Sequence, residues 1–220
     1  MLCKVTEGKN AEGEDKHKCA QYWPRNVNEE QTHGDVKVVN SRVKSIKNEP
    51  TVRKITLILT WNENGKPKER KVNHFQCTDW VDYGVPPTRL TALNILDEVR
   101  GTKKPITVHC SAGIGRTGTF VAFEFMLEKL ISAESCKPMN EIVKELRTYR
   151  AHSIQEESQY LFIHRVMLHF FIEDLEFRNN LSPELQGKFE KFTESYDAML
   201  PKWVAMAVAA SNELQVPPKH

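Results

Sequence analysis

A cysteine and an arginine bracket a short glycine-rich segment in the middle of the chain. The segment reads His109-Cys110-Ser-Ala-Gly-Ile-Gly-Arg116-Thr117-Gly118 and separates a short apolar stretch from a long apolar helix pattern. Backbone N–H groups of such a loop, together with the N-terminus of the following helix, form a binding site for an anion. Arg116 can bind two oxygens of that anion, and the positive field favours the thiolate form of Cys110. The segment therefore predicts a thiolate beneath a bound phosphate, arranged to attack phosphorus.

The same residues also match a second pattern, GxGxxG, through Gly113, Gly115 and Gly118. That pattern is typical of dinucleotide-binding units, which need a second strand ending in an acidic residue about 20 positions further on. The acidic residue near that distance, Glu134, lies in the loop sequence ESCKPMN with no strand pattern before it. The sequence therefore favours cysteine chemistry on a phosphate over dinucleotide binding.

Residue by residue, segment 109–118 resembles the HCxxGxxR[ST]G signature of the classical cysteine-dependent protein tyrosine phosphatases. Three further segments are similar to motifs of that family, and together the likeness extends over roughly residues 1–175. The first resembles KCxQYWP, the second the mobile WPDxGVP loop, and the third QTxxQY. They are Lys18-Cys-Ala-Gln-Tyr-Trp-Pro24, Trp80-Val81-Asp82-Tyr-Gly84-Val-Pro86, and Gln155-Glu-Glu-Ser-Gln159-Tyr160, the last preceded by Arg147 and Arg150.

The resemblance implies hydrolysis of phosphotyrosine in proteins, in two steps and without a cofactor or a metal. Cys110 attacks phosphorus while Asp82 protonates the leaving tyrosyl oxygen. Water positioned by Gln155 and Gln159 then cleaves the cysteinyl-phosphate, with Asp82 as base. The implied catalytic residues are Cys110, Arg116, Asp82, Gln155, Gln159, Thr117, which donates a hydrogen bond to the sulfur, and His109, which holds the loop. The implied substrate-binding residues are Ser111, Ala112, Gly113, Ile114, Gly115, Arg116, Trp80 and Gln155.

Each of these residues also has a purely structural interpretation. Free cysteine is among the most buried residue types, so Cys110 could be a packing residue. Asp82 could be a turn former, and glutamines four residues apart at a helix start are common on surfaces. We favour the catalytic interpretation of Cys110 because packing alone does not require the glycine-rich loop that follows it. The neighbours of Asp82, namely Trp80 and Gly84-Val-Pro86, favour the acid role.

The chain departs from the family pattern at two positions beside these motifs. Val81 stands where the acid loop usually has proline, and because proline fixes φ, we expect altered loop closure with lower turnover and retained substrate binding. Glu156 replaces threonine after the first glutamine, which adds negative charge near the pocket rim. We expect Glu156 to weaken the binding of acidic peptides.

A complete domain of this family begins further upstream, with a segment that inserts an aromatic ring beside the phosphotyrosine. No stretch of the sequence matches that segment or the YINA-type strand after it. We therefore expect a catalytic region that is N-terminally incomplete, with Met1-Leu2-Cys3 starting inside a core strand. From a different class of function, the alternative is a catalytically impaired phosphotyrosine-binding or regulatory module.

The elements that must position these residues indicate an α/β fold, with a twisted mixed β-sheet flanked by helices. Apolar residues alternate along residues 36–61, Asn64-Gly65 predicts a turn, and residues 68–76 read as the returning strand. Pro105–His109 reads as a short strand, and loop 78–87 as carrying an exposed Trp80. Helices are expected from a Thr88 cap to Gly101, from Thr117 to Ile131, from an Asn140 cap, and from Glu157 to Glu173.

The pattern changes after residue 177, which divides the chain into a catalytic region, 1–177, and a helical C-terminal extension, 178–220. Ser182-Pro183 predicts a helix start, and apolar residues then recur at spacings of three and four. Pro201 is expected to break this helix before a short alanine-rich one. The pattern does not identify a partner for the extension.

Composition limits the class of protein. The 220 residues are 40% hydrophobic and 27% charged, with a net charge of +2, which is typical of a globular domain and gives no bulk argument for nucleic-acid binding. The five cysteines have no zinc-site spacing, and no segment predicts a signal peptide or a membrane span. We expect a cytoplasmic protein whose partners are phosphotyrosine-containing proteins or peptides.

Overall fold

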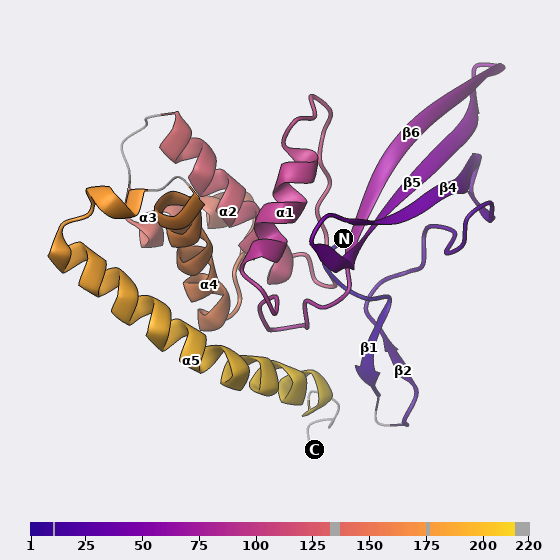
Figure 1. The fold of residues 1–220 in the computed structure, drawn as a ribbon. Helices are drawn as coiled ribbons and strands as arrows, with labels where there is room; N and C mark the ends of the chain where they lie inside the picture. The colour runs from indigo at the N-terminus through magenta and orange to yellow at the C-terminus, as the bar shows by residue number, and fades with distance from the viewer. Residues whose placement is uncertain (11, 133–136, 175–176, 214–220) are drawn as a thin grey trace.

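A twisted β-sheet lies on one side of the molecule and a group of helices on the other (Figure 1). The computed structural model describes the chain except for residues 11, 133–136, 175–176 and 214–220. The N-terminus lies between the sheet and the helices, and a small separate hairpin projects beside it (Figure 1). This hairpin consists of β1 (Thr6–Lys9) and β2 (Asp15–His17).

The main sheet has the order β3-β4-β5-β6, with each strand antiparallel to its neighbour. Its strands are β3 (Glu30–His33), β4 (Val36–Ile46), β5 (Glu49–Glu63) and β6 (Lys66–Cys77). The predicted strand pattern and hairpin are confirmed, since Asn64 and Gly65 have φ values of 52° and 76° between β5 and β6. Two positive φ values at this position are those of a tight hairpin turn, and only small residues adopt them readily.

The α/β fold with a twisted sheet and flanking helices is confirmed, although the pairing differs from the mixed sheet that we expected. All ladders in the described residues are antiparallel. The prediction of a strand at Pro105–His109 is wrong, because this segment has no strand conformation. Pro105, its first residue, has no backbone N–H to donate to a neighbouring strand, and Ile106 is 50% exposed. A main-chain hydrogen bond of this segment joins Leu2 N to His109 O at 2.8 Å.

Among the described residues, five α-helices follow the sheet, and four of them were expected with small errors at their ends. They are α1 (Leu90–Val99), α2 (Arg116–Ile131), α3 (Met139–Tyr149), α4 (Glu157–Leu168) and α5 (Pro183–Glu213). A π-helical turn, η1 (His169–Asp174), continues α4, and a 3-10 turn, η2 (Phe177–Asn180), precedes α5. Neither expected cap is correct, because α1 begins after Arg89 and α3 begins one residue before Asn140.

The predicted break at Pro201 is wrong, because α5 continues through this residue (Figure 1). A proline inside a helix removes one hydrogen bond and costs about 3 kcal/mol. Packing offsets that loss, since Tyr196 and Ala207, on either side of the proline, are 4% and 5% exposed. Leu200 and Trp203 pack against the same core. The two halves of α5 therefore share one buried face.

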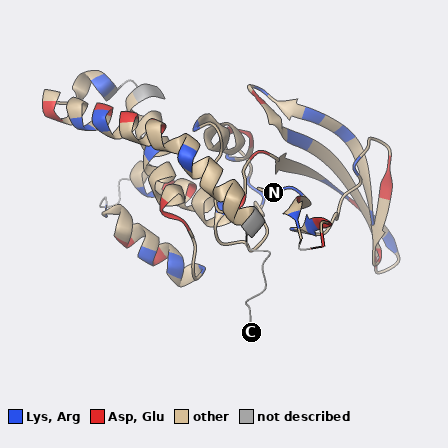
Figure 2. Ribbon diagram, turned by 90° about the horizontal axis from the view of Figure 1, so that it is seen from below, with Lys and Arg blue, Asp and Glu red and all other residues tan. Residues whose placement is uncertain are grey.

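Charges of both signs occur on the helices and on the sheet (Figure 2). Among the described residues, none of the helices combines the length and the apolar composition that crossing a lipid bilayer requires. Residues 1–3 are buried in the core, where Met1 O accepts a hydrogen bond from Cys77 N at 3.0 Å. Together with the bond from Leu2 N to His109 O, this places the start of the chain between the end of β6 and the residue before Cys110.

Candidate active site

The cysteine loop predicted from the sequence lies at the N-terminus of α2, with Cys110 only 4% exposed. Gly113 has a φ of 74°, and its N–H donates to Cys110 Sγ at 3.3 Å. A left-handed residue at this point turns the backbone N–H groups inward, which is how a loop forms an anion-binding concavity. The loop is fixed at its far side, where Ile154 N donates to Ile114 O at 3.0 Å.

Two glycines of the loop lie against the segment before α4, and at Gly118 the neighbouring atoms are backbone, so a side chain is excluded there. A Cβ on Gly118 would lie 2.7 Å from Ile154 N and 2.9 Å from Ser153 Cα. A Cβ on Gly113 would lie 2.9 Å from Arg150 Nη2, which also donates to Ala112 O at 3.4 Å. The glycine spacing therefore serves packing against residues 150–154 as well as turning the chain.

The environment of Cys110 favours its thiolate. Burial raises the pKa of the thiol, but interactions with Thr117, the N–H of Gly113 and the charge of Arg116 outweigh that effect and hold the pKa below its ordinary value. Arg116 therefore lies close enough to lower the pKa of the thiol, whereas Thr117 Oγ1 is buried with no hydrogen-bond partner among the described residues, so its donation to the sulfur stays a prediction. A thiolate near neutral pH is the nucleophilic form of cysteine.

Arg116 is the most deeply buried charge of the site, with a side chain that is 0% exposed. Its Nη1 donates to Glu7 Oε1 and to Trp80 O, both at 2.7 Å, and its Nη2 donates to Asp82 Oδ1 at 3.1 Å. Its Nε is buried without a hydrogen-bond partner among the described residues. The guanidinium is thus held in place from two sides and keeps a donor for an oxyanion.

Asp82 lies in the predicted acid loop and is brought to the cysteine loop by two cations. Its Oδ2 accepts from Lys18 Nζ at 2.7 Å and its Oδ1 from Arg116 Nη2 at 3.1 Å. The turn that carries Asp82 is closed by a hydrogen bond from Gly84 N to Val81 O at 3.2 Å. The carboxylate and the thiol, 28 positions apart in the numbering, therefore belong to one cluster around Arg116.

The expectation of an exposed Trp80 is wrong, since its side chain is completely buried. Its indole N–H donates to Gly84 O at 2.8 Å, and its ring lies 5.9 Å from that of Phe162 on α4. A buried indole needs such a partner for its N–H. Trp80 thus anchors the acid loop and contacts Arg116 through its backbone oxygen rather than presenting its ring at the surface.

The two predicted glutamines have different surroundings. Gln155 is exposed, and its Oε1 lies only 2.5 Å from where a Cβ on Gly115 would be, so it borders the cysteine loop. Gln159 is fully buried, accepts from Gln155 N at 3.0 Å, and donates to Gly84 O at 3.2 Å. Gln155 can therefore reach a water molecule above the loop, while the amide of Gln159 joins the start of α4 to the acid loop.

Both ring nitrogens of His109 lie within hydrogen-bond distance of a partner. Its Nδ1 lies 3.1 Å from Cys110 O, and its Nε2 lies 2.7 Å from the hydroxyl of Tyr22, which in turn lies 3.1 Å from His74 Nε2. These contacts agree with the predicted role of holding the loop. Of the remaining loop residues, Ser111 and Ala112 are exposed at its mouth, and Ile114 is half-buried.

Two residues that the structure places in the site had no role predicted from the sequence. Glu7, on β1, forms the 2.7 Å ion pair with Arg116, and Lys18 forms the 2.7 Å pair with Asp82. Lys18 was visible as the first residue of the KCxQYWP-like segment. A single glutamate on a short polar strand carries no periodic signal, so Glu7 could be found only from the three-dimensional structure.

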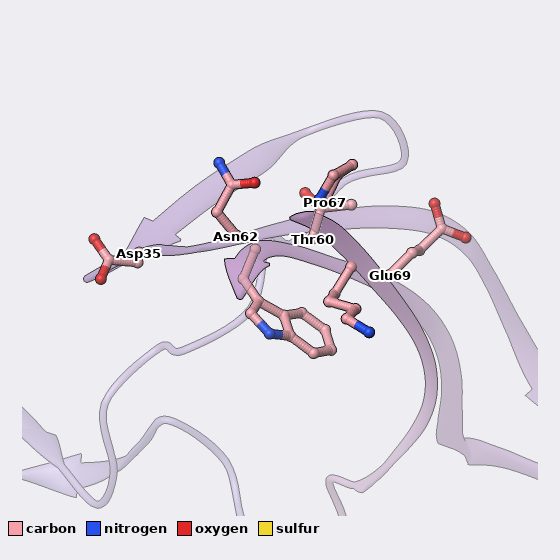
Figure 3. A pocket seen from close by; sticks show the side chains of 7 residues that line it. Asp35, Thr60, Asn62, Pro67 and Glu69 are labelled. Atoms are coloured by element: carbon pink, nitrogen blue, oxygen red, sulfur yellow. The ribbon is translucent and has the colours of Figure 1, made fainter. Parts of the chain in front are cut away.

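A cavity of about 430 Å³ lies elsewhere, on the outer part of the β5–β6 hairpin (Figure 3). Its lining includes Asp35, Thr60, Asn62, Pro67 and Glu69 but none of the residues predicted for catalysis. Within the described part of the chain, no group of three or more His, Cys, Asp or Glu side chains is placed to hold a metal ion.

Comparison with known proteins identifies the group to which this arrangement is related. Residues 1–169 match the family model described as protein-tyrosine phosphatase. The human receptor-type tyrosine-protein phosphatase zeta is 35% identical over 161 residues, covering 70% of this chain and 7% of that protein. The mouse non-receptor type 9 phosphatase is 34% identical over 174 residues, covering 70% of this chain and 28% of that protein.

Solved structures show the same likeness. The Trypanosoma brucei phosphatase TbPTP1 superimposes with a TM-score of 0.64 at 27% identity, covering 76% of this chain and 58% of that one. PTPN18 in complex with phosphorylated HER2 peptides gives a TM-score of 0.65 at 25% identity, covering 78% and 61%. The chain thus spans less than two thirds of the length of these relatives.

Proposed function

The chain belongs to the protein-tyrosine phosphatase family, and from this premise we propose that it hydrolyses phosphotyrosine in proteins through a cysteinyl-phosphate intermediate. One observation carries the proposal: the Cys110 thiol and a buried, partnerless Nε of Arg116 belong to one loop at the N-terminus of α2. A thiolate, a guanidinium and inward N–H groups are what attack on a phosphate dianion requires.

In the first step, Cys110 Sγ attacks phosphorus and the bond from phosphorus to the tyrosyl oxygen breaks. The leaving oxygen takes a proton from the carboxylic acid form of Asp82. Arg116 and the loop amides from Ser111 to Gly115 bind the equatorial oxygens, and the phosphate replaces Asp82 as the partner of Arg116 Nη2. Thr117 supports the sulfur as its charge changes.

In the second step, a water molecule attacks phosphorus, the S–P bond breaks, and Asp82 takes the proton of the water. Gln155 positions this water, because it borders the loop at Gly115 and is exposed. Gln159 contributes by holding Gly84 and the backbone of Gln155. The ring of His109 contacts Cys110 O and holds the segment that leads into Cys110. The indole of Trp80 holds the acid loop through its hydrogen bond to Gly84 O.

We further propose that residues 1–177 form the catalytic region and that residues 178–220 are an extension containing α5. The proposed partners are phosphotyrosine-containing proteins or peptides, as in the PTPN18 complexes with phosphorylated HER2 peptides. The proposed location is the cytoplasm, because a catalytic thiolate needs a reducing compartment and because Cys3, Cys19, Cys77 and Cys110 are free thiols.

The test is turnover of a small aryl phosphate by the full chain. Cys110→Ser is expected to lower the rate by about 10⁴-fold or more, and Arg116→Met by about 10²- to 10³-fold. Cys77→Ser, at a buried free thiol outside the loop, is the control and should retain most of the rate. Acid quenching after labelled substrate should trap phosphate on Cys110. A wild-type rate equal to that of Cys110→Ser, with a phosphotyrosine peptide still bound, would establish the binding module instead.

The pH dependence of Cys110 alkylation gives a second readout. Because the pKa of Cys110 lies below its ordinary value, alkylation by iodoacetamide should stay rapid below the pH at which an ordinary thiol becomes protonated. Arg116→Met removes a charge that lowers this pKa, so its alkylation profile should move to higher pH. An unchanged profile would show that Arg116 does not stabilise the thiolate.

A further inference from the structure

Helix α5 lies outside residues 1–169, the part of the chain that matches the family model. It runs past α4, and its C-terminal part reaches the small hairpin at β1 (Figure 1). Contacts of α5 with both α4 and β1 place one added helix against two elements that are far apart in the sequence.

One face of α5 is buried between Phe189 and Ser211. Phe189, Tyr196, Ala207 and Ser211 are between 4% and 9% exposed. The rings of Tyr196 and Trp203 lie 5.2 Å apart on the same face. These residues are four or seven positions apart, which places their side chains in one stripe along the helix. Helix α5 is therefore packed against the rest of the protein.

The acid loop is one of the surfaces that this stripe covers. A Cβ on Gly84 would lie 3.1 Å from the Cβ of Ala207 and 2.6 Å from Cγ2 of Val81. The carbonyl of the same glycine accepts from Trp80 Nε1 at 2.8 Å and from Gln159 Nε2 at 3.2 Å. Gly84 is therefore held through its oxygen by two side chains and covered at its Cα by α5.

The other covered element, β1, carries Glu7. Glu7 and Asp82 are the two carboxylates that ion-pair with Arg116, at 2.7 and 3.1 Å. Asp82 stands two residues before Gly84 in the acid loop. The C-terminal turns of α5 thus contact both elements that bring a carboxylate to the buried guanidinium.

We propose that the buried face of the C-terminal part of α5, formed by Trp203, Ala207 and Ser211, is a positioning element that holds the acid loop and β1 around Arg116, with Ala207 as its central residue. Small size at position 207 is essential, because the Cβ of Ala207 is already in van der Waals contact with the Cα side of Gly84. Disturbing this contact loosens the acid loop and displaces Asp82, which lowers the rate of the chemical step and leaves oxyanion binding nearly intact. The effect on rate rests on the proposed function, whereas the effect on the loop does not.

The experiment measures hydrogen exchange of residues 78–87 in the full chain, beside aryl phosphate turnover. Ala207→Gly removes the contact without overpacking, and Ala207→Leu forces the neighbours apart. Ala205→Gly and Ala205→Leu are the matched controls, because Ala205 is exposed on the same helix and carries the same changes in helix propensity. Ala207→Gly keeps the test valid if Ala207→Leu does not fold.

Both Ala207 variants should exchange at residues 78–87 at least about tenfold faster than their Ala205 controls, while α2 keeps its protection. Their kcat should fall about three- to tenfold, with KM and vanadate affinity within about twofold of the wild type. Equal exchange at residues 78–87 in the Ala207 and Ala205 variants would overturn the proposal. Faster exchange in a protein without phosphatase activity would support the positioning role and refute the proposed function.

Discussion

The cysteine loop and the acid loop reach the same guanidinium in opposite ways. The cysteine loop places the proposed nucleophile Cys110, the amides proposed to bind the anion and Arg116 within residues 110–118, at the start of one helix. The acid loop contributes a single carboxylate and depends on distant segments, because Lys18, Arg116 and Gln159 fix its position. The proposed phosphate site is therefore formed by residues close together in the sequence, while the proposed acid is placed by residues that are far apart in it.

Substitution of Asp82 tests the acid loop alone and should change turnover more than the substitutions that follow. Asp82→Asn retains the shape of the loop but cannot donate a proton, so kcat for a poor leaving group should fall about 10²- to 10⁴-fold. With a highly acidic phenol as leaving group the loss should be much smaller, because that oxygen leaves without a proton. Asp79→Asn, on the exposed part of the same loop, should change kcat less than twofold. A uniform loss for all leaving groups would refute the acid role.

The next prediction tests whether the cysteine loop depends on its contact with residues 153–154. Gly118→Ala places a Cβ 2.7 Å from Ile154 N, and because backbone cannot yield easily, the free energy of unfolding should fall by about 3 kcal/mol. Gly187→Ala, in α5 where no atom lies within 4 Å, should raise it by up to about 1 kcal/mol. Urea denaturation measures both. Equal effects would mean that residues 153–154 do not constrain the loop.

A smaller effect is expected where the two halves meet. Glu7→Gln keeps a hydrogen-bond acceptor for Arg116 but removes the charge of one of the two carboxylates that pair with the guanidinium. We therefore expect kcat/KM to fall about tenfold. The exposed Glu12→Gln, in the turn between β1 and β2, is the control and should leave kcat/KM unchanged. Restoration of the full rate by added salt would indicate that Glu7 acts only through long-range charge.

The smallest effect sharpens the account of the acid loop. Val81→Pro restores the residue that the family usually has, and a fixed φ removes conformational freedom equivalent to about 0.4 to 1 kcal/mol. We therefore expect kcat to rise about two- to fivefold with KM unchanged, measured with the same aryl phosphate. An unaltered kcat would show that contacts of Gly84 and Trp80 already fix the loop without the proline.

The cysteine loop and the acid loop differ in how much of their structure the residue types predict. The loop after Cys110 and the start of α2 were predicted to within one residue, because their contacts are local and their residue types are restrictive. The acid loop was located through resemblance, but its tryptophan was expected outside and is fully buried. Burial of Trp80 depends on Phe162 and Gly84, one of which lies some 80 positions away.

The errors in the fold have a similar origin. Pro201 was expected to end a helix because local propensity opposes it, yet packing of Tyr196 and Ala207 on the same core keeps α5 continuous. Pro105–His109 was expected as a strand because it is apolar, but the described ladders do not include it. Tertiary contacts decided both cases against the local signal.

The sequence by itself determined the family, and it supplied the proposed nucleophile and the proposed oxyanion-binding arginine, because these depend on residue types at fixed short spacings. Only the tertiary structure decided that Glu7 and Asp82 share Arg116, that Gln159 holds Gly84, and that Ala207 covers that same glycine. Two of these contacts, between Glu7 and Arg116 and between Ala207 and Gly84, join segments more than a hundred positions apart. No local pattern encodes them, because they exist only when burial of the core brings the segments together.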